Sequence, residues 1–237
     1  MNIKDAAEFL NVSEMTIRRW TNSEKLKCYR LGGRRERRFR KSDLEEFLQG
    51  SQYYRLKPLG FGGHLVPDGS HLTNFYTGKE EGLSVSIPYL LEAVREGESV
   101  LAVMPPERSK ELLKKLKGEG HPVGLWLQNG RLNITTGMDS PDRMIRYLKD
   151  FADKTPKFRV LGDMIWTLRK GWNLTALRAF EEIPSLMPPV KNGLLLCQYS
   201  LDEVSGAHIM MAAEVHRHMI YKGRMEKSPY YAFENNY

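Results

Sequence analysis

Cysteine is scarce in this chain of 237 residues, which has only Cys28 and Cys197. Two distant cysteines cannot form a disulfide framework, nor can they make a four-ligand zinc site by themselves. Long apolar runs are missing too, because no stretch approaches the roughly 18–20 residues that a membrane-spanning helix needs. The N-terminus is mixed and charged, unlike a secretory signal. The sequence therefore predicts a reduced cytoplasmic protein that has no membrane partner.

Positive charge is in excess, with 36 Lys and Arg against 29 Asp and Glu and a net charge of +7. The first 50 residues hold 12 basic and 8 acidic side chains, so +4 of this excess lies in about a fifth of the chain. Six basic residues fall in the eight positions 34–41, opposed by Glu36. Such a run is usually a solvated face, and its meaning depends on the elements around it.

Residues 3–22 have the pattern of two short helices joined by a tight turn. Apolar residues recur at helical spacing in the first, expected over 3–10, and Ser13 is a suitable N-cap for the second, expected over 14–22. The apolar residues that the second helix should bury are Met15, Ile17 and Trp20. Two such helices form a helix-turn-helix, whose second helix can enter the DNA major groove.

A basic hairpin is expected next. Residues 27–31 and 37–40 flank Gly32-Gly33, which predicts two antiparallel strands with an arginine-covered tip. Ser42 then precedes a third helix, expected over 43–48. The side chains expected to contact bases or phosphates are Thr16, Arg18, Arg19, Arg30, Arg34, Arg35, Arg37, Arg38 and Arg40.

The segments AAEFLNVSEMTIRRWTNSEKL, YRLGGRRERRF and KSDLEEFL, taken together, resemble the winged-helix module of the MerR and excisionase families. The resemblance covers about the first 50 residues. It implies that the second helix reads the major groove while the wing follows the DNA backbone or minor groove. A small basic protein-binding module is the alternative interpretation of the same residues.

Glycine and proline gather in residues 51–69, which we interpret as a linker between a first domain over 1–50 and a second over 70–237. In the second domain, continuous apolar strands are predicted over 99–104 and 193–199, and shorter ones over 123–127, 132–136 and 158–161; amphipathic helices lie between them. Strands that are apolar on both faces and separated by helices indicate a mainly parallel sheet covered on both sides. The fold class is therefore α/β with three layers.

The turn over residues 77–84 is the place to look for a phosphate loop. It is one residue short of the G-x-x-x-x-G-K-[ST] pattern, Leu83 stands where the lysine should be, and Glu80 and Glu81 would repel phosphate. ATP hydrolysis is therefore not expected, although weak nucleotide binding stays open. Glu107, just after the 99–104 strand, is where a RecA-like ATPase would carry an acid.

Polar side chains near predicted strand ends make up a second candidate site, as expected in α/β folds. These candidate ligand-binding residues are His71, Tyr76, Asp163, Trp166, Glu181, Cys197, Tyr199 and His216. Each also has a structural interpretation: a hydrogen-bonded histidine, a helix-capping Asp163, a core Trp166, or a buried small Cys197. The sequence predicts no metal site and leaves any cofactor unknown.

The ordered motifs H-x-x-x-F-Y, G-D-M-x-W and C-x-Y, followed by a late histidine, resemble the MEDS sensory domain of methanogen and dichloromethane-responsive regulators. The resemblance covers roughly residues 69–231. It implies a RecA-like fold that lacks a working phosphate loop and senses a small molecule. A winged helix followed by this domain is the order of the dichloromethane-dehalogenase repressor type.

The resulting hypothesis is a one-component transcriptional regulator that is not an enzyme. It is expected to bind double-stranded DNA, to sense an unidentified small-molecule effector in a pocket beneath His71, Asp163 and Trp166, and to act as a homodimer on paired half-sites. A RecA-like ATPase with a DNA-targeting head and an excisionase-like architectural protein are the alternatives. The effector, the operator and the direction of regulation are not encoded in any motif.

Overall fold

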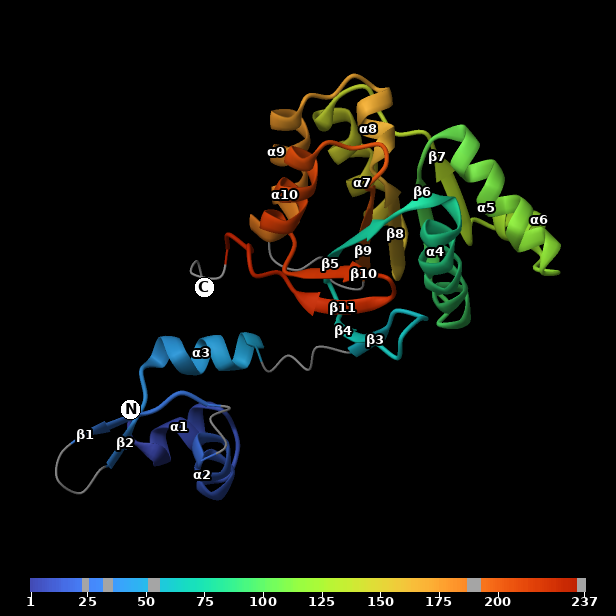
Figure 1. Cartoon of the computed structure of the whole chain (residues 1–237). Helices are drawn as coiled ribbons and strands as arrows, with labels where there is room; N and C mark the ends of the chain where they lie inside the picture. Colours follow the sequence, from blue (N-terminus) through green and yellow to red (C-terminus); the bar gives the residue numbers. More distant parts are fainter. Residues whose placement is uncertain (23–25, 32–35, 51–55, 187–192, 234–237) are drawn as a thin grey trace. The chain divides into compact units, whose positions relative to one another are not determined.

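The computed structural model describes residues 1–22, 26–31, 36–50, 56–186 and 193–233 (Figure 1). The chain divides into two compact units, Met1–Arg55 and Leu56–Tyr237. Residues from Leu56 onward therefore belong to the second unit. The predicted linker over 51–69 is too long, because much of it folds as a hairpin of that unit.

The first unit has three helices and one hairpin in its described part. Its elements are α1 (Ile3–Phe9), α2 (Glu14–Asn22), β1 (Tyr29–Leu31), β2 (Glu36–Arg38) and α3 (Lys41–Gly50). Helix α1 begins with a capping box, in which the Asn2 and Asp5 side chains accept each other's backbone N–H. The Ser13 hydroxyl accepts the Thr16 N–H at 3.2 Å, as its predicted capping role requires. Strands β1 and β2 pair antiparallel.

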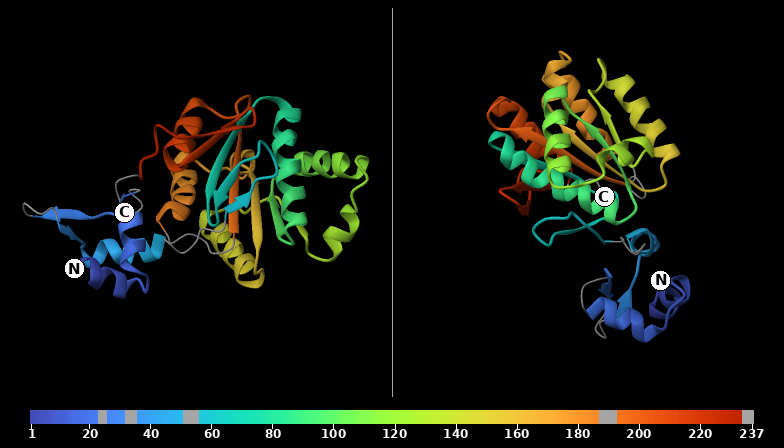
Figure 2. Two further views of the ribbon diagram at one scale, coloured as in Figure 1. Left: turned by 90° about the horizontal axis from the view of Figure 1, so that it is seen from below. Right: turned by 90° about the vertical axis from the view of Figure 1, so that its right-hand side faces the viewer.

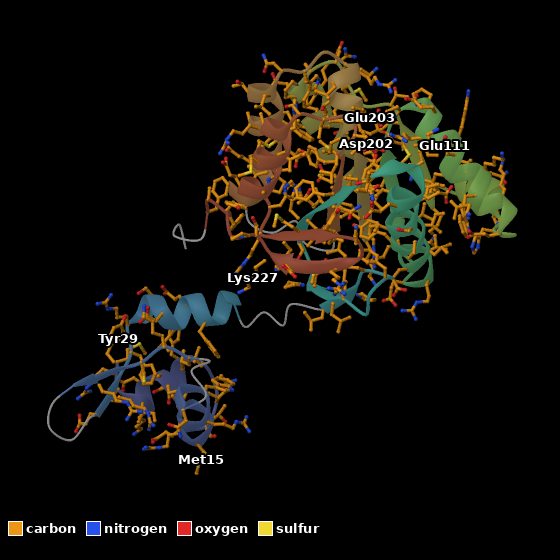
Figure 3. The ribbon with its side chains drawn as sticks, in the orientation of Figure 1. Met15, Tyr29, Glu111, Asp202, Glu203 and Lys227 are labelled. Atoms are coloured by element: carbon orange, nitrogen blue, oxygen red, sulfur yellow. The ribbon has the colours of Figure 1, made fainter. Side chains whose placement is uncertain are left out.

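The first unit differs from the prediction at two points, the burial of Met15 and the start of the third helix. Ile17 is fully buried and Trp20 packs on Phe47 with ring centroids 4.9 Å apart, but Met15 is 73% exposed (Figure 3). Met15 lies two positions before Ile17, which turns it toward the other side of α2. Helix α3 begins at Lys41, so Ser42 lies within the helix instead of capping it.

A seven-stranded sheet forms the centre of the second unit. Its strands are β5 (His71–Tyr76), β6 (Ser99–Val103), β7 (Leu132–Thr135), β8 (Phe158–Asp163), β9 (Gly193–Ser200), β10 (His218–Tyr221) and β11 (Arg224–Lys227). They lie in the order β11-β10-β5-β9-β8-β6-β7. All neighbours are parallel except β10 and β11, which are antiparallel. The predicted, mainly parallel sheet is confirmed.

Helices cover both faces of this sheet (Figures 1 and 2). One face carries α4 (Gly78–Arg95), α5 (Pro106–Gly118) and α6 (Val123–Gln128), and the other carries α7 (Pro141–Lys154), α9 (Leu174–Leu186) and α10 (Gly206–Val215). The short α8 (Ile165–Arg169) follows β8 directly. This three-layer α/β architecture is the one predicted.

The strand predicted over 123–127 is wrong, because these residues form helix α6. Val123 and Trp126, three positions apart, are buried, whereas Leu125 and Leu127 are exposed. A short apolar run does not distinguish a strand from a buried helical turn, and here the i, i+3 pair decided the structure. No described helix is long and apolar enough to cross a membrane.

Buried charges attach a small hairpin to the sheet. Strands β3 (Leu56–Pro58) and β4 (Leu65–Pro67) pair antiparallel, and Lys57 Nζ lies 2.9 Å from Asp68 and 2.8 Å from Glu98. Glu98 also accepts a bond from Arg159 Nε at 2.6 Å. Lys57, Glu98 and Arg159 are at most 5% exposed. Removing one member of a buried ionic group typically costs about 3–5 kcal/mol, so this network fixes the hairpin in place.

Two glycines with similar positive φ angles allow a matched test of core packing. Gly137 (φ +78°) lies against the Trp166 indole, which a Cβ would overlap, whereas a Cβ on Gly120 (φ +83°) meets open space. Both alanine variants carry the same left-handed strain. We expect Gly137→Ala to lower the free energy of unfolding by about 1–3 kcal/mol more than Gly120→Ala. Urea unfolding followed by tryptophan fluorescence measures the difference, and equal losses would contradict the packing described.

Candidate functional site

The sheet separates the predicted ligand-binding residues into two groups. Along β5, His71 and Phe75 face α9 and α10, whereas Leu72 and Tyr76 face α4, because successive side chains of a strand alternate. Asp163 lies on the α4 face with Tyr76. The prediction of one pocket beneath His71, Asp163 and Trp166 is therefore wrong: these side chains do not share a face.

On the α9–α10 face, four side chains converge. His71 Nε2 lies 2.8 Å from His216 Nε2, 3.0 Å from Glu181 Oε2 and 3.4 Å from Cys197 Sγ. His216 Nε2 is 3.2 Å from the same Glu181 oxygen. The residues come from β5, α9, β9 and the position after α10. We call His71, Glu181, Cys197 and His216 the histidine–cysteine cluster.

Burial and neighbouring charges shift the pKa values of this cluster. Burial, with help from His216, lowers the pKa of His71 to about 4. Burial alone would raise the pKa of Glu181, but hydrogen bonds from His216 and His71 outweigh it and hold that pKa well below its usual range. Burial and the Glu181 carboxylate raise the pKa of the Cys197 thiol. Glu181 is thus an anion and His71 a neutral imidazole near pH 7.

Two further contacts orient the cluster. The Tyr199 hydroxyl donates to Glu181 Oε1 at 3.0 Å, so that the other carboxylate oxygen, Oε2, points toward the histidines. His216 Nδ1 lies 2.8 Å from the Ala212 carbonyl, which can only accept, so Nδ1 carries a proton. Each member of the histidine–cysteine cluster offers one ligand atom, and these four atoms lie within 4.8 Å of one another.

On the α4 face, a second polar group lies at the carboxyl ends of the strands. The Tyr76 hydroxyl donates to Asp163 Oδ2 at 2.9 Å, and Arg108 Nε lies 3.5 Å from the same oxygen. Burial raises the pKa of Asp163 to about 6, although Tyr76 and Arg108 oppose the shift. The adjoining cavity measures about 20 Å³, which is room for roughly one water molecule.

The region of the suspected phosphate loop is helical. Residues 78–84 belong to α4, and the turn before it is occupied by the protein's own carboxylates. The Gly78 N–H donates to Asp202 at 2.7 Å and the Thr77 N–H to Glu81 at 2.7 Å. Figure 3 marks Asp202 near Glu203 and Glu111 at this edge of the sheet. Anions thus fill the amide positions that a phosphate would need.

Glu107 and Trp166 have structural contacts in place of site contacts. Glu107 is a half-exposed residue of α5 that pairs with Arg169 at 2.9 Å. Trp166 is 1% exposed and packs edge-on against Trp172 at 4.9 Å. The core interpretation of Trp166 is therefore the one that the geometry supports.

Sequence reasoning missed several residues near these groups. Arg108 pairs with both Asp163 and Glu203, and Ser86 donates to Gln198 at 2.7 Å. Their signal was position, since Arg108 and Glu203 closely follow the carboxyl ends of β6 and β9. A groove of about 360 Å³ between α9 and α10 was also missed. It is lined by Leu174, Thr175, Arg178, Ala207, Met210, Met211 and Glu214.

The first unit presents most of the predicted DNA-contacting side chains to solvent. Arg18, Arg19, Arg30 and Arg40 are exposed, while Thr16, Arg37 and Arg38 are partly exposed. Arg18 pairs weakly with Glu14 at 3.8 Å, and Arg37 donates to the Asn22 side chain at 2.6 Å. The Arg40 guanidinium lies 4.7 Å above the Tyr29 ring. Arg34 and Arg35 lie outside the described residues.

Comparison with protein families decides what the second unit is. A family model described as MEDS, the methanogen/methylotroph, DcmR sensory domain, matches residues 70–217. The chain belongs to the MEDS family. The matched range begins one residue before His71 and ends one residue after His216, so it encloses both polar groups of the MEDS domain. A helix-turn-helix domain model matches residues 1–52.

Two relatives resemble the chain as a whole or in its fold. The transcriptional repressor DcmR of Methylorubrum extorquens (strain DSM 6343 / CIP 106787 / DM4) is 29% identical over 238 residues, with 91% of this chain and 89% of the repressor covered. A KaiC-like protein from Pyrococcus horikoshii OT3 superposes with a TM-score of 0.53 at 15% identity, covering 71% of this chain and 81% of its own. The second likeness concerns the fold alone.

The raised pKa of Asp163 makes the stability of the MEDS domain depend on pH. A carboxyl whose pKa is higher in the folded state stabilises the fold when protonated, and this contribution is lost as the pH rises from about 4 to about 6. We expect Asp163→Asn to remove this part of the slope, up to about 3 kcal/mol. Unfolding free energies of parent and variant at pH 4, 5, 6 and 7 measure it. The exposed Asp153→Asn serves as the control, and parallel pH profiles for all three proteins would refute the prediction.

Proposed function

We propose that the protein is a one-component transcriptional regulator. Its first unit binds double-stranded operator DNA, and its MEDS domain binds a small molecule that changes the affinity for DNA. The observation that carries the proposal is the combination, in one chain, of a helix-turn-helix match over 1–52 and a MEDS match over 70–217, together with a repressor that aligns with 91% of the chain.

The exposed arginines of the first unit support DNA binding. Arg18 and Arg19 are exposed residues of α2, whereas Ile17 before them is buried. A cationic helix of a helix-turn-helix fits the major groove, and phosphate neutralisation supplies affinity. Arg30 and Arg38 lie on the paired strands β1 and β2, which would act as the wing beside the helix. This is the MerR-like arrangement that we propose for the unit.

The contacts on the α4 face of the MEDS domain support a regulatory role better than they support ATP hydrolysis. The amides of Thr77 and Gly78 are already bonded to Glu81 and Asp202, and the neighbouring cavity holds about 20 Å³. A nucleoside triphosphate would have to displace both carboxylates. We therefore propose a domain that binds without catalysing, and its effector class stays open.

Dimeric action is part of the proposal. One short recognition helix reads few base pairs, and two helices spaced by about 34–36 Å read two half-sites. Such pairing requires two copies of the chain on one operator. We propose that the MEDS domain, which belongs to the larger of the two units, supplies the contact between the copies.

Replacing both exposed arginines of α2 tests DNA binding. We expect Arg18→Ala/Arg19→Ala to weaken binding to a mixed-sequence 30-bp duplex at least tenfold in dilute salt. A lost base contact typically costs about 1–3 kcal/mol, and a lost phosphate contact lowers the salt dependence of the affinity by about one unit of slope. Fluorescence anisotropy over a salt series measures both the affinity and the slope.

The matched control removes the same charge elsewhere. Lys110 and Lys114 are exposed residues of α5 in the MEDS domain, so Lys110→Ala/Lys114→Ala should bind the duplex as the parent does. Equal weakening in both double variants would reduce the effect to net charge. No duplex binding by the parent in dilute buffer would overturn the proposed function.

A further inference from the structure

We propose that the histidine–cysteine cluster is a closed zinc site. Its ligands are His71 Nε2, Glu181 Oε2, Cys197 Sγ and His216 Nε2, and its role is to hold α9 and α10 against strands β5 and β9. The proposal stands on the geometry of the MEDS domain and does not depend on DNA binding.

The spacing of the four atoms suits a tetrahedral ion. Zinc bonds of about 2.0–2.3 Å to nitrogen, oxygen and sulfur place the ligand atoms of a tetrahedron roughly 3.3–3.6 Å apart. In the cluster, His71 Nε2 lies 2.8 Å from His216 Nε2, 3.0 Å from Glu181 Oε2 and 3.4 Å from Cys197 Sγ. These contacts would have to lengthen by a few tenths of an ångström to reach tetrahedral spacing, and all four ligand atoms already lie within 4.8 Å of one another.

The contacts of His71 call for a cation at the centre. Its Nε2 is surrounded by three atoms with lone pairs, on His216, Glu181 and Cys197, all within 3.4 Å. A single proton on Nε2 can serve one of these contacts well. A central ion would accept all four lone pairs at once.

Charge balance also favours a divalent ion. With Cys197 as a thiolate and Glu181 as a carboxylate, a 2+ ion makes a site of zero net charge. The side chains of Glu181 and His216 are at most 1% exposed, and uncompensated charge is costly at that depth. Two imidazoles, one thiolate and one carboxylate are a borderline-soft set, which suits zinc better than magnesium or calcium.

Groups around the cluster already hold the ligands in coordinating orientations. The Ala212 carbonyl accepts a hydrogen bond from Nδ1–H of His216, which turns Nε2 inward. The Tyr199 hydroxyl donates to Oε1 of Glu181, so that Oε2 points to the histidines. Metal sites use such outer contacts to fix tautomer and rotamer. Four protein ligands leave no open position, so the geometry points to a structural ion and away from a catalytic one.

The experiment is metal analysis of the untagged full-length protein. We expect about one zinc per chain after purification, or after chelator treatment and return of zinc, measured by plasma mass spectrometry. His216→Gln and Cys197→Ser should lose stoichiometric zinc, while His218→Gln and Cys28→Ser should keep it, because these residues lie outside the cluster. Tyr199→Phe should keep the fold and weaken zinc about 10–100-fold in competition with a chromophoric chelator.

Cobalt binding to the parent protein is a second readout, and it does not depend on how the variants fold. Cobalt added to the metal-free parent should give the intense visible bands of a tetrahedral site together with a thiolate-to-cobalt charge-transfer band. Zinc should also raise the Tm of the parent by several degrees and leave that of His216→Gln unchanged. Sub-stoichiometric zinc in the reconstituted parent, a cobalt spectrum without the thiolate band, or zinc retained by both ligand variants would each overturn the proposal.

Discussion

The buried carboxylate of Glu181 is the interaction on which the α9–α10 side of the MEDS domain depends. It lies on a helix yet faces two histidines and a tyrosine that come from β5, β9 and the end of α10. An anion this deeply buried needs compensation, so these elements must keep their register for the charge to be tolerated. The position of α9 against the sheet is thereby tied to residues of other segments, among them His71, which lies more than a hundred positions before Glu181.

The two faces of the sheet compensate their charged groups in different ways. On the α4 face, the carboxyl ends of the strands meet helix N-termini, where α/β folds commonly bind anionic ligands. Here the carboxylates of Asp202 and Glu81 accept hydrogen bonds from the backbone amides at the start of α4. Arg108 forms ion pairs with both Asp163 and Glu203. The protein provides its own anions at this edge.

Local sequence patterns predicted much of the fold correctly. The capped helices of the first unit, its hairpin and the apolar strands of the second follow from spacing, caps and turn residues, which act over a few positions. Errors arose where local signals compete. The 123–127 run suited either a strand or a helix, and Met15 was apolar yet faced solvent, because burial depends on which neighbour covers a face.

The sequence by itself determined the fold class, the basic first unit and the identity of the polar residues, since these depend on composition and short-range periodicity. Only the tertiary structure decided how those residues are grouped. Strand alternation and the order β10-β5-β9-β8 bring His71 together with Cys197 and His216 on one face of the sheet. They bring Tyr76 together with Asp163 on the opposite face. Ligand atoms from distant segments meet through strand register and helix packing, and no motif in one segment encodes that meeting.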